Sequence, residues 1–273
     1  MKIFIHLAII TILSCSRANA QQLIDGLIAS EKNFAKTSKE QSTKKAFLAF
    51  VDSNCVGFSG GEQVNVFKEW MNRKEDGSKL TWAPGFVIIS SSGEMGVTTG
   101  PWEYREKSLN DTAVAQGHFT TVWKKNKQGR WKAVFDMGIS YPEKIANSAT
   151  IKKFEVSKPV KSITAASLLI NTEMTFIDAF ASDHNMAIKR VLVPDSWFNI
   201  NNMEPLKNAA AINAAINNIP ANTVFKSISL IASNNGDMFA AYGVAQTGDK
   251  KQNYMRLWVR QNAEWKLLMM VIH

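Results

Sequence analysis

Two aspartates are the candidates for acid–base chemistry in this sequence. A general base has to lie inside a pocket, within hydrogen-bond reach of the substrate, with a pKa tuned by burial. Asp52 comes just before the first predicted strand, and Asp136 lies on the last predicted strand of the first half. Asp52 also fits a turn or helix-end position, and strand alternation places Asp136 on the outer face of its sheet. We therefore expect no catalysis, with a base at Asp52 or Asp136 as the alternative.

A second group of residues could bind a ligand in a pocket of the first half. Neighbouring side chains of a strand point to opposite faces, so one anchor residue orients the others. With Lys124 and Lys132 taken as outward, the inner face is apolar and aromatic, although a bulge near a strand end would reverse the assignment. The candidate ligand-binding residues here are Trp82, Thr99, Thr121, Trp123 and Phe135.

The second half offers a cation and two phenols. Anchored on an inward Trp258, alternation turns Tyr254 and Arg256 inward and aligns Arg256 with Thr121, and Tyr242 is also assigned to the inner face. These three side chains fit a clamp for a carboxylate or another acidic ligand. The alternative is that Arg256 pairs with a carboxylate of the protein at the mouth of the pocket.

The outer face of the second half is predicted to be apolar. Leu268, Met270 and Ile272 follow Lys266 outward on the last strand. An apolar face of this kind has to be covered, and the simplest cover is another sheet, either from the first half or from a second copy of the chain.

Two further patterns carry little weight. Residues 57–61 fit the G-x-S-x-G pattern of a hydrolase, but that mechanism needs a strand–turn–helix in an α/β sheet, so we assign the glycines to a turn. Beyond the N-terminal segment the histidines are His118, His184 and His273, which are widely separated, and no His or Cys pair has ligand spacing. We expect neither a metal site nor a cofactor.

Charge and cysteine content narrow the class of protein. The formal net charge is +9, and the lysines are scattered rather than gathered in an arginine-rich arm or a nucleic-acid-binding motif. A solvated surface explains them, so nucleic acid is not an expected partner. Without residues 1–20, Cys55 is the one cysteine left, which excludes an intramolecular disulfide and favours a small buried side chain.

The N-terminus carries an export pattern. Lys2 precedes an apolar run over residues 3–13, and residues 18–20 (Ala-Asn-Ala) offer a cleavage position. The run is too short to span a bilayer, so no membrane span is expected. We predict a signal peptide over residues 1–20 and a periplasmic or secreted protein, with a lipoprotein acylated at Cys15 as the alternative.

The two halves of the chain repeat the same motifs in the same order. The matched pairs are Glu31 and Glu173, Phe34 and Phe176, residues 92–95 and 235–238, Gly100 and Gly243, and the tryptophan pairs Trp123/Trp131 and Trp258/Trp265. In each half, apolar residues at helical spacing precede long strands joined by Gly- and Asn-containing turns. This order favours an α+β fold with antiparallel strands over a parallel βαβ sheet. We predict domains at 21–145 and 163–273, joined by a linker at 146–162.

Three stretches of the first half resemble a known family. They are residues 92–100 (SGEMGVTTG), 117–124 (GHFTTVWK) and 129–138 (GRWKAVFDMG). Together they resemble a SnoaL-like domain of the nuclear transport factor 2-like (NTF2-like) superfamily, and more narrowly its uncharacterised bacterial branch, which also resembles ketosteroid isomerases. The resemblance implies two tandem cone-shaped domains, each a curved antiparallel sheet wrapped around about three helices, with a pocket at the open end.

The resemblance implies little about chemistry, because this fold carries isomerases, cyclases, dehydratases and binding modules. Where ketosteroid isomerases use a tyrosine on the first helix, this chain has Phe34 and Phe176. We therefore expect an exported, non-catalytic protein that binds a small apolar or acidic ligand in a cone-shaped pocket. The alternative is a ketosteroid-isomerase-like or cyclase-like enzyme with an Asp general base in the first domain.

Overall fold

The first half of the chain folds as helices followed mainly by strands. The computed structural model describes residues 3–142, 150–156 and 165–273. The first-half elements are, in order, α1 (Ile3–Glu40), α2 (Thr43–Phe50), β1 (Val51–Ser59), β2 (Glu62–Asn65), α3 (Val66–Asn72), β3 (Lys79–Trp82), β4 (Phe86–Ile89), β5 (Met95–Arg105), β6 (Ala115–Lys125), β7 (Trp131–Ser140) and β8 (Lys152–Glu155). Within the described residues these strands form one sheet in the order β2-β1-β7-β6-β5-β4-β8, with β3 paired to β5. The pairing is antiparallel except for β1 with β7 and β4 with β8.

The second half repeats this arrangement. Its elements are α4 (Ala166–Ser182), α5 (His184–Val191), β9 (Leu192–Ile200), α6 (Ala209–Ala214), the short 3-10 helix η1 (Ile216–Asn218), β10 (Thr223–Ala232), β11 (Met238–Thr247), β12 (Lys250–Gln261) and β13 (Glu264–Ile272). The strand order is β10-β11-β12-β13-β9, and only β13 with β9 is parallel. The path β4-β5-β6-β7-β1 of the first sheet thus recurs in the second sheet, parallel pair included. The predicted α+β fold with two cone-shaped units is confirmed.

Local sequence explains where the second helix of each unit begins. The Ser42 side chain accepts a hydrogen bond from the Lys45 backbone N at 3.1 Å at the start of α2. The Asp183 carboxylate does the same for Met186 N, at 3.0 Å, at the start of α5. Short polar side chains at these positions satisfy amide groups of the first turn that have no partner within the helix.

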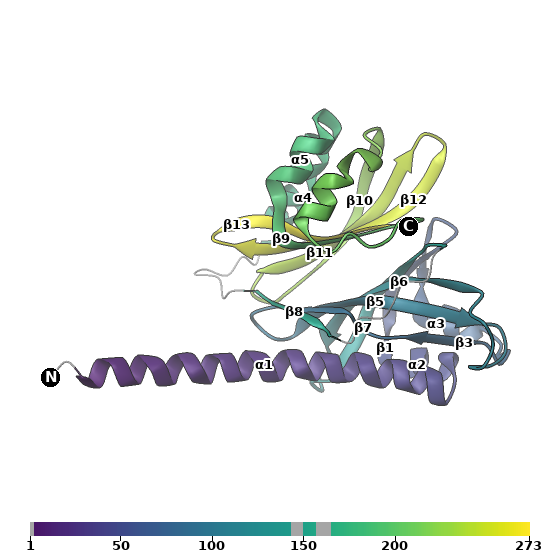
Figure 1. Ribbon diagram of the computed structural model, residues 1–273, viewed down its shortest axis with the longest axis horizontal. Helices are drawn as coiled ribbons and strands as arrows, with labels where there is room; N and C mark the ends of the chain where they lie inside the picture. The colour runs from purple at the N-terminus through teal and green to yellow at the C-terminus, as the bar shows by residue number, and fades with distance from the viewer. Residues whose placement is uncertain (1–2, 143–149, 157–164) are drawn as a thin grey trace.

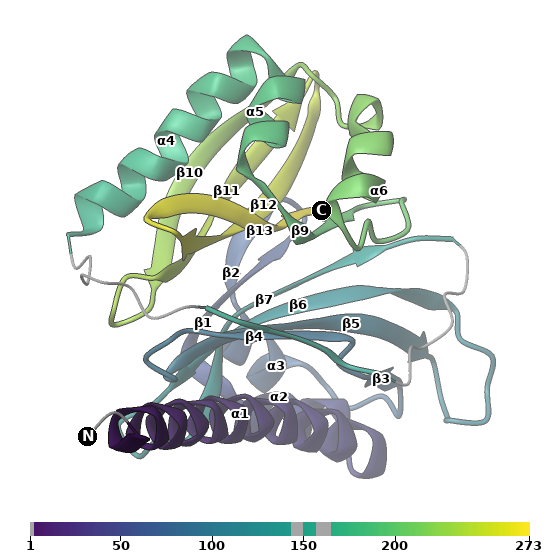
Figure 2. The same cartoon turned by 60° about the vertical axis from the view of Figure 1, so that its left-hand side comes forward.

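The two sheets lie against each other, with helices on their far sides. Figure 1 shows α1 and α2 below the first sheet and α4, α5 and α6 above the second, and Figure 2 shows the same layers from another side. One hydrophobic core lies between the sheets and includes Val97 and Val122 of the first sheet and Met255 and Leu257 of the second. The predicted apolar outer face of the second half is therefore covered by the first sheet of the same chain.

Each unit also has an inner core between its sheet and its own helices. In the first unit, Leu27 and Phe34 of α1 pack with Phe47 of α2 and Trp123 of β6. In the second unit the inner core is built around α4, α5 and the concave side of the sheet. Each sheet is thus buried on both faces. A ligand cavity can form in the interior of a cone, between a sheet and its own helices.

A β-bulge in the last long strand of each unit changes which side chains face inward. On β7, Phe135 pairs with Val122 and Ala133 pairs with Trp123, so Val134 is an extra residue. On β13, Met269 pairs with Leu257 and Leu267 pairs with Trp258, so Leu268 is extra in the same way. Residues beyond such a bulge switch faces.

The bulges correct four sequence assignments. Phe135, expected in the pocket, lies in the core between the sheets, and Asp136, expected on the outer face, points into the first cone. Met270 and Ile272, expected on the outer face of the second half, belong to its inner core. Simple alternation assigned these residues to the wrong face because it assumes that no extra residue is inserted into the strand.

The predicted export and linker segments have local structure of their own. The predicted cleavage position after residue 20 lies inside α1. Part of the predicted linker, residues 152–155, forms β8 at the edge of the first sheet, while residues 146–149 and 157–162 of it lie outside the described residues. In the part of the chain that the structure describes, no helix has both the length and the apolar composition to cross a membrane.

Candidate ligand-binding cavity

The first unit contains a cavity of about 410 Å³ walled mainly by aromatic rings. Its ring-bearing residues are Phe34, Phe47, Trp82, Trp102, Tyr104 and Phe119, which come from α1, α2, β3, β5 and β6. The rings of Phe34 and Phe47 lie 4.9 Å apart, and those of Phe34 and Trp82 lie 4.7 Å apart. A volume of this size is within the range of small-molecule sites.

Asp136 is the acidic group of this cavity. Its carboxylate accepts a hydrogen bond from Thr121 Oγ1 at 2.6 Å, because the bulge places the two residues opposite each other on β7 and β6. Burial raises the pKa of Asp136 to about 6, although the hydrogen bond from Thr121 acts in the opposite direction. At neutral pH the group is largely ionised inside an apolar wall.

The same carboxylate borders a second hollow. This hollow has a volume of about 540 Å³ and is lined by residues of β1, β2 and α3, including Phe58 and Trp70, and by Asp136 and Arg73, which also line the first cavity. The side chain of Asp136 therefore lies where two spaces meet, and a ligand that reaches it can extend in either direction.

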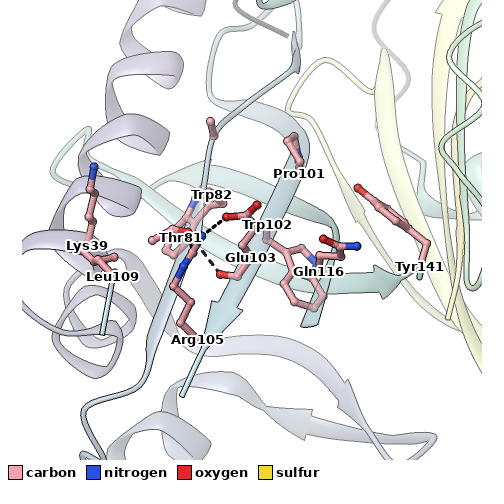
Figure 3. Close-up of a pocket in the computed structure, with 11 residues that line it drawn as sticks. Lys39, Thr81, Trp82, Pro101, Trp102, Glu103, Arg105, Leu109, Gln116 and Tyr141 are labelled. Atoms are coloured by element: carbon pink, nitrogen blue, oxygen red, sulfur yellow. Dashed lines mark hydrogen bonds and ion pairs between the residues drawn. The ribbon is translucent and has the colours of Figure 1, made fainter. Parts of the chain in front are cut away.

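A third hollow, of about 320 Å³, lies at the edge of β3 and β5 and is drawn in Figure 3. Two of its charged groups are partners of each other: the Arg105 guanidinium bonds to Glu103 and, at 3.2 Å, to Thr81 Oγ1. Arg105 Nε also donates to the Asp111 carbonyl at 3.0 Å. This hollow shares Trp82 and Trp102 with the aromatic cavity, but its Arg105 and Glu103 side chains bond to each other.

A fully buried glutamate, Glu31 of α1, lies in the inner core of the first unit. One of its carboxylate oxygens accepts from Trp82 Nε1 at 2.6 Å, and the other accepts from Thr98 Oγ1 and from Trp123 Nε1 at 3.3 Å. Burial raises the pKa of Glu31 to about 7, and the negative charge of Asp136 adds to the increase. Among the described residues, the hydrogen-bond donors to this carboxylate are all neutral.

The second unit holds Glu173 at the matching position of α4, with a different set of partners. Arg256 Nη2 and Nε donate to it at 2.6 and 3.0 Å, Tyr254 Oη at 2.9 Å and Trp258 Nε1 at 2.8 Å. Burial alone would raise the pKa of Glu173, but the Arg256 charge and the hydrogen bonds outweigh burial and lower it. Of the two sequence alternatives for Arg256, the structure shows pairing with a carboxylate, located in the interior rather than at a pocket mouth.

Thr99 and Tyr242 do not lie in the pockets for which the sequence proposed them. The Thr99 hydroxyl accepts from Asn199 Nδ2 at 3.0 Å, a contact between the two sheets. The Tyr242 ring packs against Phe135, with centroids 5.1 Å apart, in the core between the sheets. The two residues are equivalent in the repeat, and both were placed one residue out of phase because no anchor existed on β5 or β11. Thr98, not Thr99, faces inward.

The remaining predicted residues are divided between cavity and core. Trp82 and Thr121 line the aromatic cavity. Trp123 faces inward but is fully buried, and its indole donates to Thr98 Oγ1 at 2.9 Å. Asp52 is not among the residues that line this cavity, and it accepts a hydrogen bond from the Asn54 backbone N at 2.9 Å.

Sequence reasoning assigned no role to Glu31 or Glu173, although it matched them in the repeat. The signal was present, because Glu31 continues the buried stripe of Leu27 and Phe34 at helical spacing. A carboxylate on such a stripe has to find buried donors. His273, at the end of β13, lines the first-unit cavity and could not be assigned from sequence, because it belongs to the other half of the chain.

Histidine, cysteine and carboxylate side chains do not gather into groups of three suited to a metal ion in the described ranges. His118 lies between the sheets, where its Nδ1 is 2.8 Å from Tyr141 Oη, and burial lowers its pKa to about 3. Cys55 is buried in the inner core of the first unit, and burial raises the pKa of its thiol.

Comparison with known proteins gives similarity at the level of single units. No protein-family model and no curated protein matches the sequence. An NTF2-like protein from Cytophaga hutchinsonii is 15% identical, over 40% of this chain and 98% of its own, with a TM-score of 0.33. NTF2-like proteins of unknown function from Pseudomonas putida and Shewanella oneidensis are 17% and 18% identical, over 41% and 42% of this chain and 87% and 96% of theirs, both with TM-scores of 0.34. The chain is similar to these proteins over about the length of one unit.

Proposed function

We propose that the protein binds a small, largely apolar molecule in the first-unit cavity, with Asp136 as the polar anchor. The observation that carries the proposal is the cavity of about 410 Å³, whose described lining includes six Phe, Trp and Tyr side chains and one carboxylate, that of Asp136. Aromatic walls favour an apolar ring system, and one fixed polar group is enough to orient it.

The second unit is proposed to be a scaffold rather than a second binding site. The expectation of an acidic ligand depended on Arg256, but that guanidinium is fully buried and bonded to Glu173. The second sheet instead covers the outer face of the first and contributes His273 to its cavity. An acidic ligand is therefore not part of the proposal.

We also propose that the chain is a tandem of two SnoaL-like domains, over residues 21–145 and 163–273, in the NTF2-like superfamily. Support comes from the recurring strand order and from the matched bulges at Val134 and Leu268. Export to the periplasm or the exterior through a signal peptide over residues 1–20 remains part of the proposal, supported by the sequence pattern, with acylation at Cys15 as the alternative.

The binding proposal is tested with a neutral aromatic dye, N-phenyl-1-naphthylamine, whose fluorescence rises in apolar surroundings. We expect saturable binding at one site, and we expect Ser140→Trp to abolish it because Ser140 lines the cavity and has an exposed side chain. Ser229→Trp, at an exposed position of β10 outside the cavity, is the matched control and is expected to bind normally. Equal binding by both variants would contradict the proposal.

A second function, catalysis with Asp136 as general base, is favoured by one observation. A carboxylate with a pKa of about 6 inside an apolar cavity is close to the range suited to proton abstraction at neutral pH. Catalysis predicts that the protein accelerates exchange of an α-proton of 2-tetralone for solvent deuterium, measured by NMR, and that Asp136→Asn removes the acceleration. Exchange at the uncatalysed rate in the wild type would leave binding as the function.

A further inference from the structure

The second unit shows which partner satisfies a buried carboxylate inside this type of cone. The guanidinium carbon of Arg256 lies 4.1 Å from the ring centroid of Tyr254, 4.2 Å from Phe225 and 4.9 Å from Phe176, and the guanidinium bonds to Glu173. A delocalised cation between aromatic faces and a carboxylate is a favourable combination in an apolar interior. The second unit thus carries its own cation.

The first unit lacks a cation at the matching position. Thr121 lies two residues before Trp123, as Arg256 lies two residues before Trp258, so Thr121 takes the strand position of the arginine. The cavity opens beside Thr121, and the carboxylate there is Asp136. Across the described ranges, no cationic side chain forms an ion pair with Asp136.

Asp136 places a carboxylate in the cavity wall, and few other titratable groups lie near it. Glu31 and Cys55 are close enough on the interior side for the charge of Asp136 to raise their pKa values. The two other titratable groups of interest are Arg73 and His273. Arg73 lines the cavity with its guanidinium over the Trp70 ring at 4.9 Å, and burial lowers the pKa of the His273 imidazole. The attraction for a cation is therefore local to the carboxylate of Asp136, which Thr121 contacts with a neutral hydroxyl.

The walls of the cavity suit a cation as well as an apolar ring. Phe34, Phe47, Trp82 and Phe119 line it, and Trp70 lines the adjoining hollow that shares Asp136. Ring faces attract a positive charge through their quadrupole, and they do so more strongly where water is excluded. Aromatic faces and an unpaired carboxylate therefore select for the same ligand class.

We propose that the ligand is an organic cation: a ring-bearing apolar amine whose protonated nitrogen lies against Asp136, as the guanidinium of Arg256 lies against Glu173 in the second unit. The inference rests on the proposed binding cavity and names its ligand class. The ligand supplies the positive charge that the second unit carries in its own sequence.

Three probes with the same naphthyl ring test the charge of the ligand by calorimetry on the full chain at pH 7.5: 1-naphthylmethylamine, 1-naphthalenemethanol and 1-naphthoate. We expect the amine to bind at least about tenfold more tightly than the alcohol, as for a hydrogen bond between charged groups, and the naphthoate to bind least. Asp136→Asn should remove the advantage of the amine over the alcohol.

Two further variants control the experiment. Asp136→Glu keeps the charge and is expected to keep the preference for the amine, which separates a charge effect from misfolding. Asp52→Asn, a matched change on β1 outside the cavity, should behave as the wild type.

The remaining outcomes separate a failure of the cationic-ligand inference from a failure of the proposed binding cavity. If the alcohol binds as tightly as the amine, and Ser140→Trp blocks both, the cavity binds ligands but the inference of a cation is wrong. If no probe binds, or if Ser140→Trp leaves the binding unchanged, the proposed binding cavity is wrong and the inference falls with it.

Discussion

Glu31 and Glu173 occupy the same place in the two units and are stabilised in opposite ways. Glu173 is paired with Arg256, and its pKa is lowered. Glu31 receives hydrogen bonds from Thr98 and two tryptophans, without a cation, and its pKa is raised to about 7. The buried glutamate is therefore the ion-pair partner of an arginine in the second unit, whereas in the first unit it is a carboxyl group with a pKa near neutral.

The comparison also explains why a cavity lies in the first unit. Arg256 is long enough to fill the space between α4 and β12, and three aromatic rings surround it. Thr121, at the same strand position, is short, and the space beside it is the aromatic cavity. A large cation in the second unit thus corresponds to a small hydroxyl beside the cavity in the first.

The largest expected effect comes from removing the cation of the second unit. Arg256→Met leaves the carboxylate of Glu173 buried without its charge partner, which is expected to cost about 3 to 5 kcal/mol of unfolding free energy. Urea denaturation of the full chain measures the loss. The second change Glu173→Leu, made in the same chain, should recover much of it.

The matched control for this pair is Arg105→Met. Arg105 also bonds to a glutamate, Glu103, but at the partly exposed edge of the first sheet. Exposed and partly exposed pairs contribute about 1 kcal/mol or less. A loss at Arg256 no larger than the loss at Arg105 would contradict the description of the second interior.

The pH dependence of stability should differ in sign between the two glutamates. A carboxyl whose folded pKa of about 7 exceeds the unfolded value of 4.5 stabilises the fold fully below pH 4.5 and loses that contribution as pH rises to about 7. For Glu31 the loss is on the order of 3 kcal/mol. Glu173, with a lowered pKa, contributes fully above pH 4.5 and loses its contribution as pH falls through its folded pKa.

Glu31→Gln isolates the contribution of the first unit. The difference in unfolding free energy between wild type and variant, measured by urea denaturation at intervals from pH 4.5 to 8, should shift in favour of the variant as pH rises. Asp136, whose pKa is also raised, contributes equally to both proteins and cancels to first order. Two parallel pH curves would show that Glu31 does not titrate in this range.

A smaller loss of stability is expected from substituting two glycines that occupy equivalent positions in the two units. Gly100 and Gly243 match in the repeat, and a Cβ at either would lie 2.0 or 2.1 Å from a backbone carbonyl, of Ala83 or Lys226 respectively. Gly100→Ala and Gly243→Ala should therefore each cost about 1 to 3 kcal/mol, as overpacking typically does. Thermal or urea unfolding measures both, and a large cost at one position alone would mean that the two sheets are not equivalent there.

The smallest effect concerns Thr121, which donates a hydrogen bond to Asp136. Thr121→Val keeps the shape of the side chain and removes the hydrogen bond that lowers the Asp136 pKa. We expect that pKa to rise above about 6, followed by carbon-13 NMR of the carboxyl group as a function of pH. A fall in the pKa would mean that another donor replaces Thr121.

Much of the fold could be predicted from the sequence. Helical spacing followed by alternating strands indicated the α+β class, and the matched motifs indicated two similar units, because these signals are local and repeat along the chain. Thr121 and Arg256 were predicted to face inward, since each lies on a strand with a correct anchor residue, whereas Trp82 was a candidate on a strand without an anchor. The apolar outer face of the second half was expected to need a covering sheet, and it has one.

The tertiary structure alone decided which acid lies in the cavity and which charges meet. The extra residues Val134 and Leu268 reverse the faces of the strands that follow them, and a bulge leaves no mark in the alternation of apolar residues when both faces are buried. The pairing of Glu173 with Arg256 joins residues 83 positions apart in the sequence. Local pattern orients each side chain relative to its neighbours, whereas burial, partner and pKa depend on segments that only the folded chain brings together.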